Sequence, residues 1–163
     1  VNLLQFSWNK CSAESYPINV RSLQIAPDPL LIPGNLNLGF DFDSNVNITS
    51  PTPLSVKIQK HMGFFWYTIP CEDDVGSCEY KDFCAKWPFF ERCPNAFKKY
   101  DIPCNCPISA GSYHLPLSFI TKLDKGPIPK WMEDGKYKIK IVLSNPEGEQ
   151  LLCLAINLKL ASN

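Results

Sequence analysis

The residues best suited to covalent or metal chemistry are eight cysteines, concentrated in the middle of the chain. They are Cys11, Cys71, Cys78, Cys84, Cys93, Cys104, Cys106 and Cys153. An even number of cysteines at this density is typical of disulfide-bonded secreted or lysosomal proteins. A metal site is the alternative, but no two cysteines have C-x-x-C spacing, and His61 and His114 are not spaced as zinc ligands. The sequence therefore predicts disulfides and no metal site.

The spacing of the cysteines leaves their pairing open. Cys104 and Cys106 flank a single residue and do not readily pair with each other, so their simplest partners are Cys84 and Cys93. A bond between the two outermost cysteines would tie the N-terminal part of the chain to its last strand. The chain-entropy model gives such a large loop roughly 4 to 5 kcal/mol of stabilisation.

Residues suited to acid–base or nucleophilic catalysis are few and scattered. The chain has no G-x-S-x-G motif and no glycine-rich phosphate loop. Neither His61 nor His114 has a nucleophile marked beside it, and the acidic pairs Asp73-Asp74 and Glu147/Glu149 stand in expected loops. An esterase that uses one of the histidines on a bound lipid is therefore disfavoured. We expect no enzyme activity, no catalytic residue and no cofactor.

The charge balance and the compartment signals limit the partners. Lys+Arg and Asp+Glu both number 16, so the formal net charge is zero and we expect no nucleic-acid partner. No apolar run approaches the roughly 18 to 20 residues of a membrane-spanning helix. The chain begins at Val1 rather than Met, which indicates a mature form with any leader removed. Asn47-Ile48-Thr49 is a glycosylation sequon, which predicts a glycan on Asn47.

The elements that must position these residues are predicted to be strands. Apolar and polar residues alternate in four segments: Asn35–Phe42, Leu54–Lys60, Lys136–Ile141 and Leu152–Leu160. Period-two alternation predicts antiparallel strands with one solvated face. Glu79–Lys86 is the best candidate for a short helical turn. We therefore predict an all-β fold with little helix: one domain over residues 1–163, built as a two-sheet antiparallel β-sandwich with disulfide-stapled loops.

Three apolar clusters do not fit a plain core. One is the aromatic run Phe64–Tyr67, which breaks the alternation of a half-buried strand, and the other two lie in proline-bearing segments expected to be surface loops. Basic residues flank all three, as at a membrane interface. The alternative is a second small core under the cysteine-rich loops. The expected lipid- and membrane-contacting rim consists of Met62, Phe64, Phe65, Trp66, Trp87, Phe89, Phe90, Trp131 and Met132.

Several motifs along the chain resemble those of one family. They include FSWNKC at Phe6–Cys11, IPGN at Ile32–Asn35, IPCNCP at Ile102–Pro107 and GSYHLP at Gly111–Pro116. Together with the strand around Cys153 they span essentially the whole chain, and all eight cysteines have counterparts. On these motifs the chain resembles the MD-2-related lipid-recognition family.

The resemblance implies a β-cup, in which two antiparallel sheets splay apart around an apolar cavity. It implies the disulfides Cys11–Cys153, Cys71–Cys78, Cys84–Cys106 and Cys93–Cys104. It also implies that Met62–Trp66 and Trp131 lie on rim loops that touch lipid and membrane. From the inward strand positions, the expected cavity lining is Phe40, Phe42, Val56, Ile58, Ile139, Ile141, Leu154 and Ile156.

The expected function is that of a secreted or lysosomal lipid-binding and lipid-transfer protein. Its expected partners are a lipid or glycolipid ligand, a transiently contacted membrane surface and a glycosidase to which the lipid head is presented. The alternative is an extracellular carrier of a small hydrophobic signal or fatty acid with no enzyme partner. A short spacing from Cys84 to Cys93 and the unusual Trp87-Pro88-Phe89-Phe90 stretch leave this alternative open.

Overall fold

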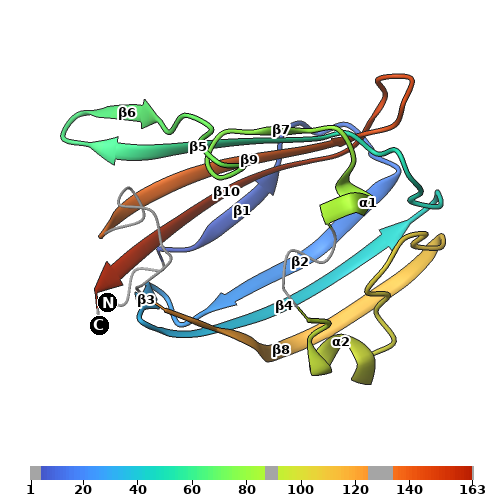
Figure 1. Cartoon of the computed structure of the whole chain (residues 1–163), viewed down its shortest axis with the longest axis horizontal. Helices are drawn as coiled ribbons and strands as arrows, with labels where there is room; N and C mark the ends of the chain where they lie inside the picture. Colours follow the sequence, from blue (N-terminus) through green and yellow to red (C-terminus); the bar gives the residue numbers. More distant parts are fainter. Residues whose placement is uncertain (1–4, 87–91, 125–133, 163) are drawn as a thin grey trace.

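The computed structural model describes residues 5–86, 92–124 and 134–162, and most of them lie in β-strands (Figure 1). The strands are β1 (Ser7–Lys10), β2 (Ile18–Ala26), β3 (Leu30–Ile32), β4 (Gly34–Ser44), β5 (Leu54–Met62), β6 (Phe65–Thr68), β7 (Glu79–Tyr80), β8 (Gly111–Leu123), β9 (Gly135–Ser144) and β10 (Gln150–Ser162). Two short helices, α1 (Phe83–Lys86) and α2 (Asn95–Lys99), lie in the connection from β7 to β8.

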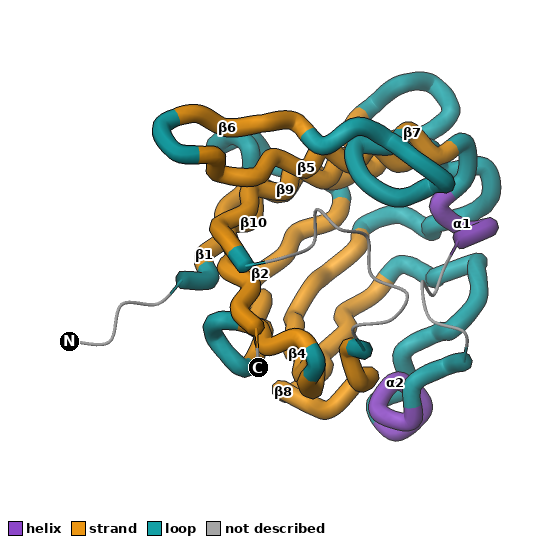
Figure 2. The backbone as a smooth tube through the Cα atoms, turned by 60° about the vertical axis from the view of Figure 1, so that its left-hand side comes forward, coloured by secondary structure: helices purple, strands orange, loops and turns teal. Residues whose placement is uncertain are grey.

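The strands form two sheets that face each other (Figures 1 and 2). The large sheet has the order β1-β10-β9-β5-β6, with β3 added parallel to β10 and β7 added to β5. The small sheet has the order β2-β4-β8, and both of its pairings are antiparallel. The prediction of two antiparallel sheets with little helix is confirmed. In Figure 1 the sheets diverge towards the end that carries β6.

The four predicted strands lie within β4, β5, β9 and β10. The predicted helical turn is only half right, because Glu79 and Tyr80 pair with β5 and only the last four residues are helical. The long strand β8 does not follow from the sequence pattern, since Pro116 interrupts it. Two irregularities in its pairing with β4 accommodate the interruption and leave Leu117 and Phe119 exposed on the outer face.

The buried core is divided because the sheets splay apart. Two closely packed sheets share one continuous core, whereas the buried residues of the described part of this chain form three clusters. The clusters are Ile18, Ile48, Leu54, Ile108, Leu143 and Leu151; then Leu30, Ile32, Tyr137 and Leu160; then Phe97, Ile102, Leu115 and Ile120.

Four disulfides hold the ends and edges of the cup together. They join Cys11 to Cys153, Cys71 to Cys78, Cys84 to Cys106 and Cys93 to Cys104, which are the pairs that the resemblance implies. The first links the segment after β1 to β10 in the large sheet. The last two fasten α1 and the segment before α2 to the loop that precedes β8. In the described residues, no helix is long and apolar enough to cross a membrane.

Candidate functional site: an apolar cavity and an aromatic hairpin

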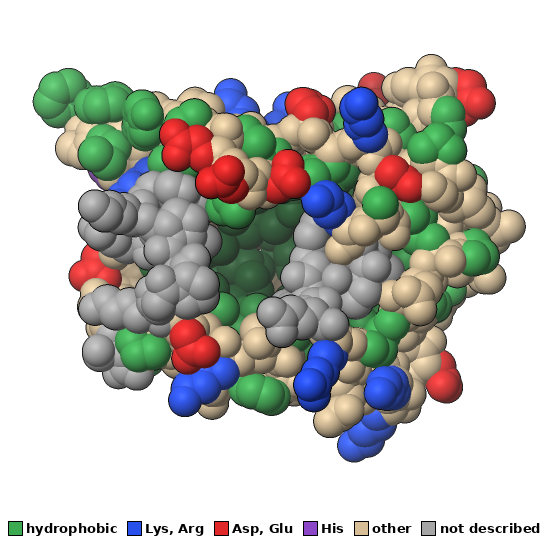
Figure 3. Space-filling model, viewed as in Figure 1, with side chains coloured by type: hydrophobic (Ala, Val, Ile, Leu, Met, Phe, Trp, Pro, Cys, Tyr) green, Lys and Arg blue, Asp and Glu red, His purple; other side chains and the backbone are tan. Residues whose placement is uncertain are grey.

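An apolar cavity of about 360 Å³ lies between the two sheets, and every described residue that lines it is apolar. Figure 3 shows a hollow with hydrophobic side chains on its floor. The small sheet contributes Ile18, Val20, Leu23, Leu38, Phe40 and Phe42; the large sheet contributes Leu54, Ile141, Leu143, Leu152 and Leu154; loops and helices contribute Ile48, Phe83, Phe97, Ile102, Pro103 and Ile108.

Aromatic contacts hold the wall of the small sheet in place. The ring of Phe40 lies 5.6 Å from that of Phe42 and meets Phe97 edge-on at 6.1 Å between centroids. Phe42 stacks on Tyr113 at 5.1 Å. Phe40 and Phe42 nevertheless remain partly exposed although they point inward. Their exposed surface faces space that the opposite sheet does not fill, so it is available to an apolar ligand.

Half of the predicted lining residues border this cavity, namely Phe40, Phe42, Ile141 and Leu154. The other four do not. Val56 packs against the cluster around Leu54, Ile58 packs against the cluster around Tyr137, and Ile139 and Ile156 lie further along the same strand faces. Alternation identifies the inward face of a strand correctly, but it does not tell how far along the strand the hollow reaches.

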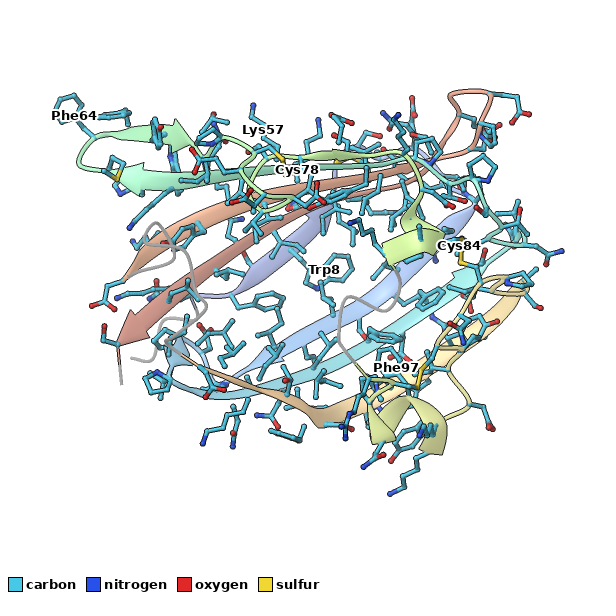
Figure 4. The ribbon with its side chains drawn as sticks, in the orientation of Figure 1. Trp8, Lys57, Phe64, Cys78, Cys84 and Phe97 are labelled. Carbon is cyan, nitrogen blue, oxygen red and sulfur yellow. A yellow bond between two sulfur atoms is a disulfide. The ribbon has the colours of Figure 1, made fainter. Side chains whose placement is uncertain are left out.

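Loop and helix residues form part of the cavity wall, and the sequence analysis did not predict them. Phe97 on α2 is almost fully buried and points inward (Figure 4). Ile102 and Pro103 immediately precede Cys104, and Phe83 immediately precedes Cys84. The signal that could have found them is this adjacency, because the disulfides of the neighbouring cysteines fasten these segments over the cavity.

Asp82 anchors the segment that carries Phe83 and Cys84. Its carboxylate accepts hydrogen bonds from Ser50 Oγ and from the backbone N–H groups of Thr52 and Cys84, the latter two at 3.0 Å. These bonds, with that of Ser50 foremost, hold the pKa of Asp82 below its usual value although partial burial opposes the shift. The ionised carboxylate therefore positions α1 beside the cavity.

The aromatic run lies on a hairpin formed by β5 and β6 at one end of the large sheet. Met62 pairs with Phe65, and the two-residue turn between them places Gly63 at a φ of 63°, as a type II′ turn requires at its first central position. Phe64 is the second turn residue and is 97% exposed (Figure 4). Met62, Phe65 and Tyr67 are also exposed. Apolar and polar residues do not alternate in this run because few side chains pack against either face of the hairpin.

Trp66 differs from its neighbours because it packs back onto the large sheet. Its ring lies 4.9 Å from that of His61, and Lys138 Nζ lies 4.1 Å from the ring centroid. The other predicted rim residues, Trp87, Phe89, Phe90, Trp131 and Met132, lie outside the described residues. The apolar tip that the structure describes therefore consists of Met62, Phe64 and Phe65.

His114 does not form a catalytic triad with the polar groups around it. On the outer face of the small sheet, Asp41 accepts hydrogen bonds from Ser22 at 2.7 Å and from His114. These two bonds lower the pKa of Asp41. In a serine–histidine–aspartate triad the histidine stands between the other two, whereas here the aspartate does. Phe40 and Phe42 point into the cavity, and successive residues of a strand point to opposite faces. Asp41, which lies between them, therefore points away from the cavity together with Ser22 and His114.

The predicted glycosylation site is exposed. Asn47 lies between β4 and β5, and its Oδ1 accepts a 2.8 Å hydrogen bond from the backbone of Ala110. That bond leaves the side-chain nitrogen, the atom to which a glycan attaches, pointing elsewhere. No group of three or more His, Cys, Asp and Glu side chains in the described part of the chain could hold a metal ion.

Comparison with known proteins identifies the family. The model of the ML (MD-2-related lipid-recognition) domain matches residues 5–160. This chain belongs to the ML domain family. The ganglioside GM2 activator of Macaca fascicularis is 37% identical to this ML domain over 157 residues, which cover 93% of this chain and 80% of the relative. That of Mus musculus is 35% identical over 155 residues, with 93% and 79% covered.

One solved structure resembles this chain over most of its length. The Niemann-Pick type C2 protein from Japanese carpenter ant has a TM-score of 0.48 and 12% sequence identity, and the match covers 94% of this chain and 98% of the ant protein.

Proposed function

We propose that this protein binds and transfers lipid without acting as an enzyme, in the extracellular space or the lysosomal lumen. The acyl or ceramide chains of a lipid or glycolipid enter the cavity, and the polar head stays outside. The observation that carries the proposal is the cavity between the sheets, whose described lining is apolar throughout. The four disulfides support the secretory or lysosomal compartment.

Apolar burial supplies the affinity for such a ligand. Each methylene group that leaves water contributes about 0.8 kcal/mol. The cavity volume of about 360 Å³ lies in the range of roughly 300 to 1,000 Å³ that is usual for ligand pockets. Because the described wall offers no polar group, it selects for the length and bulk of the chains rather than for the chemistry of the head.

The β5–β6 hairpin makes transient contact with the membrane from which the lipid is taken. Phe64 and Phe65 sit at the tip with Met62 beside them, and Lys60 and His61 lie just behind in β5. The two rings and the thioether enter the boundary between headgroups and acyl chains, while the ammonium group of Lys60 meets lipid phosphates. This contact brings the cup to the bilayer surface, where a lipid can exchange.

A glycosidase is the proposed partner of the loaded protein. Two relatives bear the name ganglioside GM2 activator, and a ganglioside is a glycolipid. A sugar head that protrudes from the cavity is accessible to an enzyme in a way that the same head within a crowded membrane is not. The protein then accelerates cleavage by presenting the substrate, and its own residues take no part in the bond-breaking step.

The first experiment is native mass spectrometry of the purified protein, followed by denaturation and identification of the released lipids. Lipids with two chains and a large polar head support the proposal, and a transfer assay between liposomes then tests extraction directly. A small single-chain ligand would instead favour a carrier of a hydrophobic signal. A protein that arrives empty and takes up no lipid at neutral or acid pH overturns the cavity proposal.

The glycosidase partnership needs a separate assay. A lysosomal hexosaminidase is given either a ganglioside in liposomes or a water-soluble chromogenic substrate, with and without this protein. Acceleration confined to the liposomal ganglioside supports presentation. Equal rates with and without the protein, in the presence of measurable lipid transfer, would refute the partnership and leave the carrier function standing.

A further inference from the structure

The outer face of the large sheet carries a group of lysines that neither the cavity nor the hairpin explains. They come from three neighbouring strands and are called the lysine face: Lys57 on β5, Lys136, Lys138 and Lys140 on β9, and Lys159 on β10. Each alternates with residues that point to the interior, and Lys57 visibly points away from the space between the sheets (Figure 4). The face is therefore on the opposite side of the sheet from the cavity.

Several of these lysines lie opposite other lysines on the neighbouring strand, an arrangement that destabilises the sheet. Lys57 lies directly opposite Lys140, and Lys136 lies directly opposite Lys159. Like charges directly opposite each other on neighbouring strands are destabilising. Among the described residues, no ion pair involves any member of the lysine face. Two uncompensated pairs of this kind indicate a surface that is shaped for a partner.

Acidic residues at the two ends of these strands are already engaged elsewhere. Glu79 accepts a 2.8 Å hydrogen bond from Ser55 at one end, and Asp134 accepts a 2.8 Å hydrogen bond from Ser162 at the other. Between them, β9 alone carries three lysines over about 14 Å, given a rise of about 3.4 Å per residue. The charge is thus arranged along a line rather than around a point.

A shallow groove of about 290 Å³ runs over the middle of this face. The polar residues that line it are Lys57, Gln59, Lys138, Lys140 and Asn157, and Ile139, Ala155 and Ile156 complete the lining. Ammonium groups bind sulfate or phosphate oxygens as point charges. Amide side chains both donate and accept hydrogen bonds, which suits the hydroxyl groups of a sugar. The groove therefore combines the two kinds of contact that a charged polysaccharide offers.

The composition of the face argues against a membrane as its occupant. Surfaces that dock on bilayers combine cations with exposed apolar side chains. The exposed large apolar residues of the described chain lie on the hairpin, in the loop after β6 and on β8, with none on β9 or β10. Trp66 is the aromatic residue that reaches this face, and Lys138 covers its ring.

We propose that the lysine face binds a linear sulfated polysaccharide of the glycosaminoglycan type. The chain lies along the strand direction, its sulfates meet the lysines, and its hydroxyls meet Gln59 and Asn157. The site is separate from the lipid cavity and does not depend on the proposed lipid function. Its effect is to hold the protein on polysaccharide at a cell surface or in the extracellular matrix while the cavity stays open.

The test is titration of the protein, residues 1–163, with a heparin octasaccharide by calorimetry over a series of salt concentrations. The variant is Lys57→Gln combined with Lys140→Gln, which removes one opposed pair and leaves Lys138 on Trp66. The control is Lys98→Gln combined with Lys99→Gln, which makes the same charge change on exposed residues of α2. A melting curve accompanies each variant, and relief of repulsion should leave the first variant as stable as the wild type or more so.

We expect the Lys57/Lys140 variant to bind at least about tenfold more weakly, with a slope of log affinity against log salt that is shallower by up to about two. The Lys98/Lys99 variant should match the wild type. The proposal is overturned if the wild type does not bind, if both variants weaken equally, or if fully desulfated heparin binds as well. It is also overturned if the Lys57/Lys140 variant loses binding to anionic vesicles but keeps binding to heparin, since the face would then serve a membrane.

Discussion

Replacing Phe64 by serine separates membrane contact from folding. Phe64 is 97% exposed at the tip of the β5–β6 hairpin, so its side chain contributes little to the folded state. If the hairpin enters a bilayer, this ring passes from water into an apolar environment. Full burial of a phenylalanine side chain is worth about 1.5 to 3 kcal/mol. At about 1.4 kcal/mol for each factor of ten, Phe64→Ser should weaken vesicle binding roughly 10- to 150-fold.

The assay is co-sedimentation with sucrose-loaded vesicles, together with thermal unfolding to show that the variant is folded. A matched control is Phe119→Ser, because Phe119 is 55% exposed but lies on the outer face of β8 in the small sheet. The Phe119→Ser variant should bind vesicles as tightly as the wild type does. Unchanged binding by Phe64→Ser, or an equal loss in both variants, would refute the role assigned to the hairpin.

Three further predictions concern the cavity and the scaffold. Val20→Trp, which fills part of the cavity, should reduce lipid uptake without lowering vesicle binding, as measured by lipid transfer. Asp82→Ala should lower the free energy of unfolding by about 1 to 3 kcal/mol, because it leaves the backbone N–H of buried Thr52 unpaired. Loss of the Cys11–Cys153 disulfide, which spans 142 residues, should cost about 5 kcal/mol, against about 2.4 kcal/mol for Cys71–Cys78, which spans 7.

The Asp82 prediction has a defined pH dependence. The folded pKa lies below the unfolded value, so the stabilisation is present above the unfolded pKa and is lost as the pH falls through the folded one. The gap between wild type and Asp82→Ala should therefore be the same at pH 7 and pH 5 and should narrow below about pH 4. A gap that already closes at pH 5 contradicts this account.

Two results would contradict the other two predictions. Normal lipid uptake by a folded Val20→Trp protein would mean that the ligand does not use this part of the cavity. A larger loss of stability on removing Cys71–Cys78 than on removing Cys11–Cys153 would mean that loop entropy does not rank these bonds.

Local patterns in the sequence were sufficient for the class of the fold and for the strands β4, β5, β9 and β10. Alternation over segments such as Lys136–Ile141 marks a strand with one buried face, because that pattern depends only on the chain's own geometry. The hairpin rings also stand out in the sequence, since four aromatic residues in a row break the alternation of a strand with one solvated face. The family motifs around the cysteines implied the four pairs that the structure contains.

Tertiary structure decided where the hollow lies and what surrounds it. Ile139 and Ile141 look alike in the sequence, yet Ile141 alone borders the cavity, because the divergence of two sheets depends on every strand at once. Phe97 and Ile102 join the wall because the segment between Cys93 and Cys104, closed by their disulfide, packs against the small sheet. The lysine face likewise exists only because β5, β9 and β10 pair in one register, which sets Lys57 beside Lys140 and Lys136 beside Lys159. Contacts between distant residues carry no periodic signal along the chain, and for that reason they appear only in the folded protein.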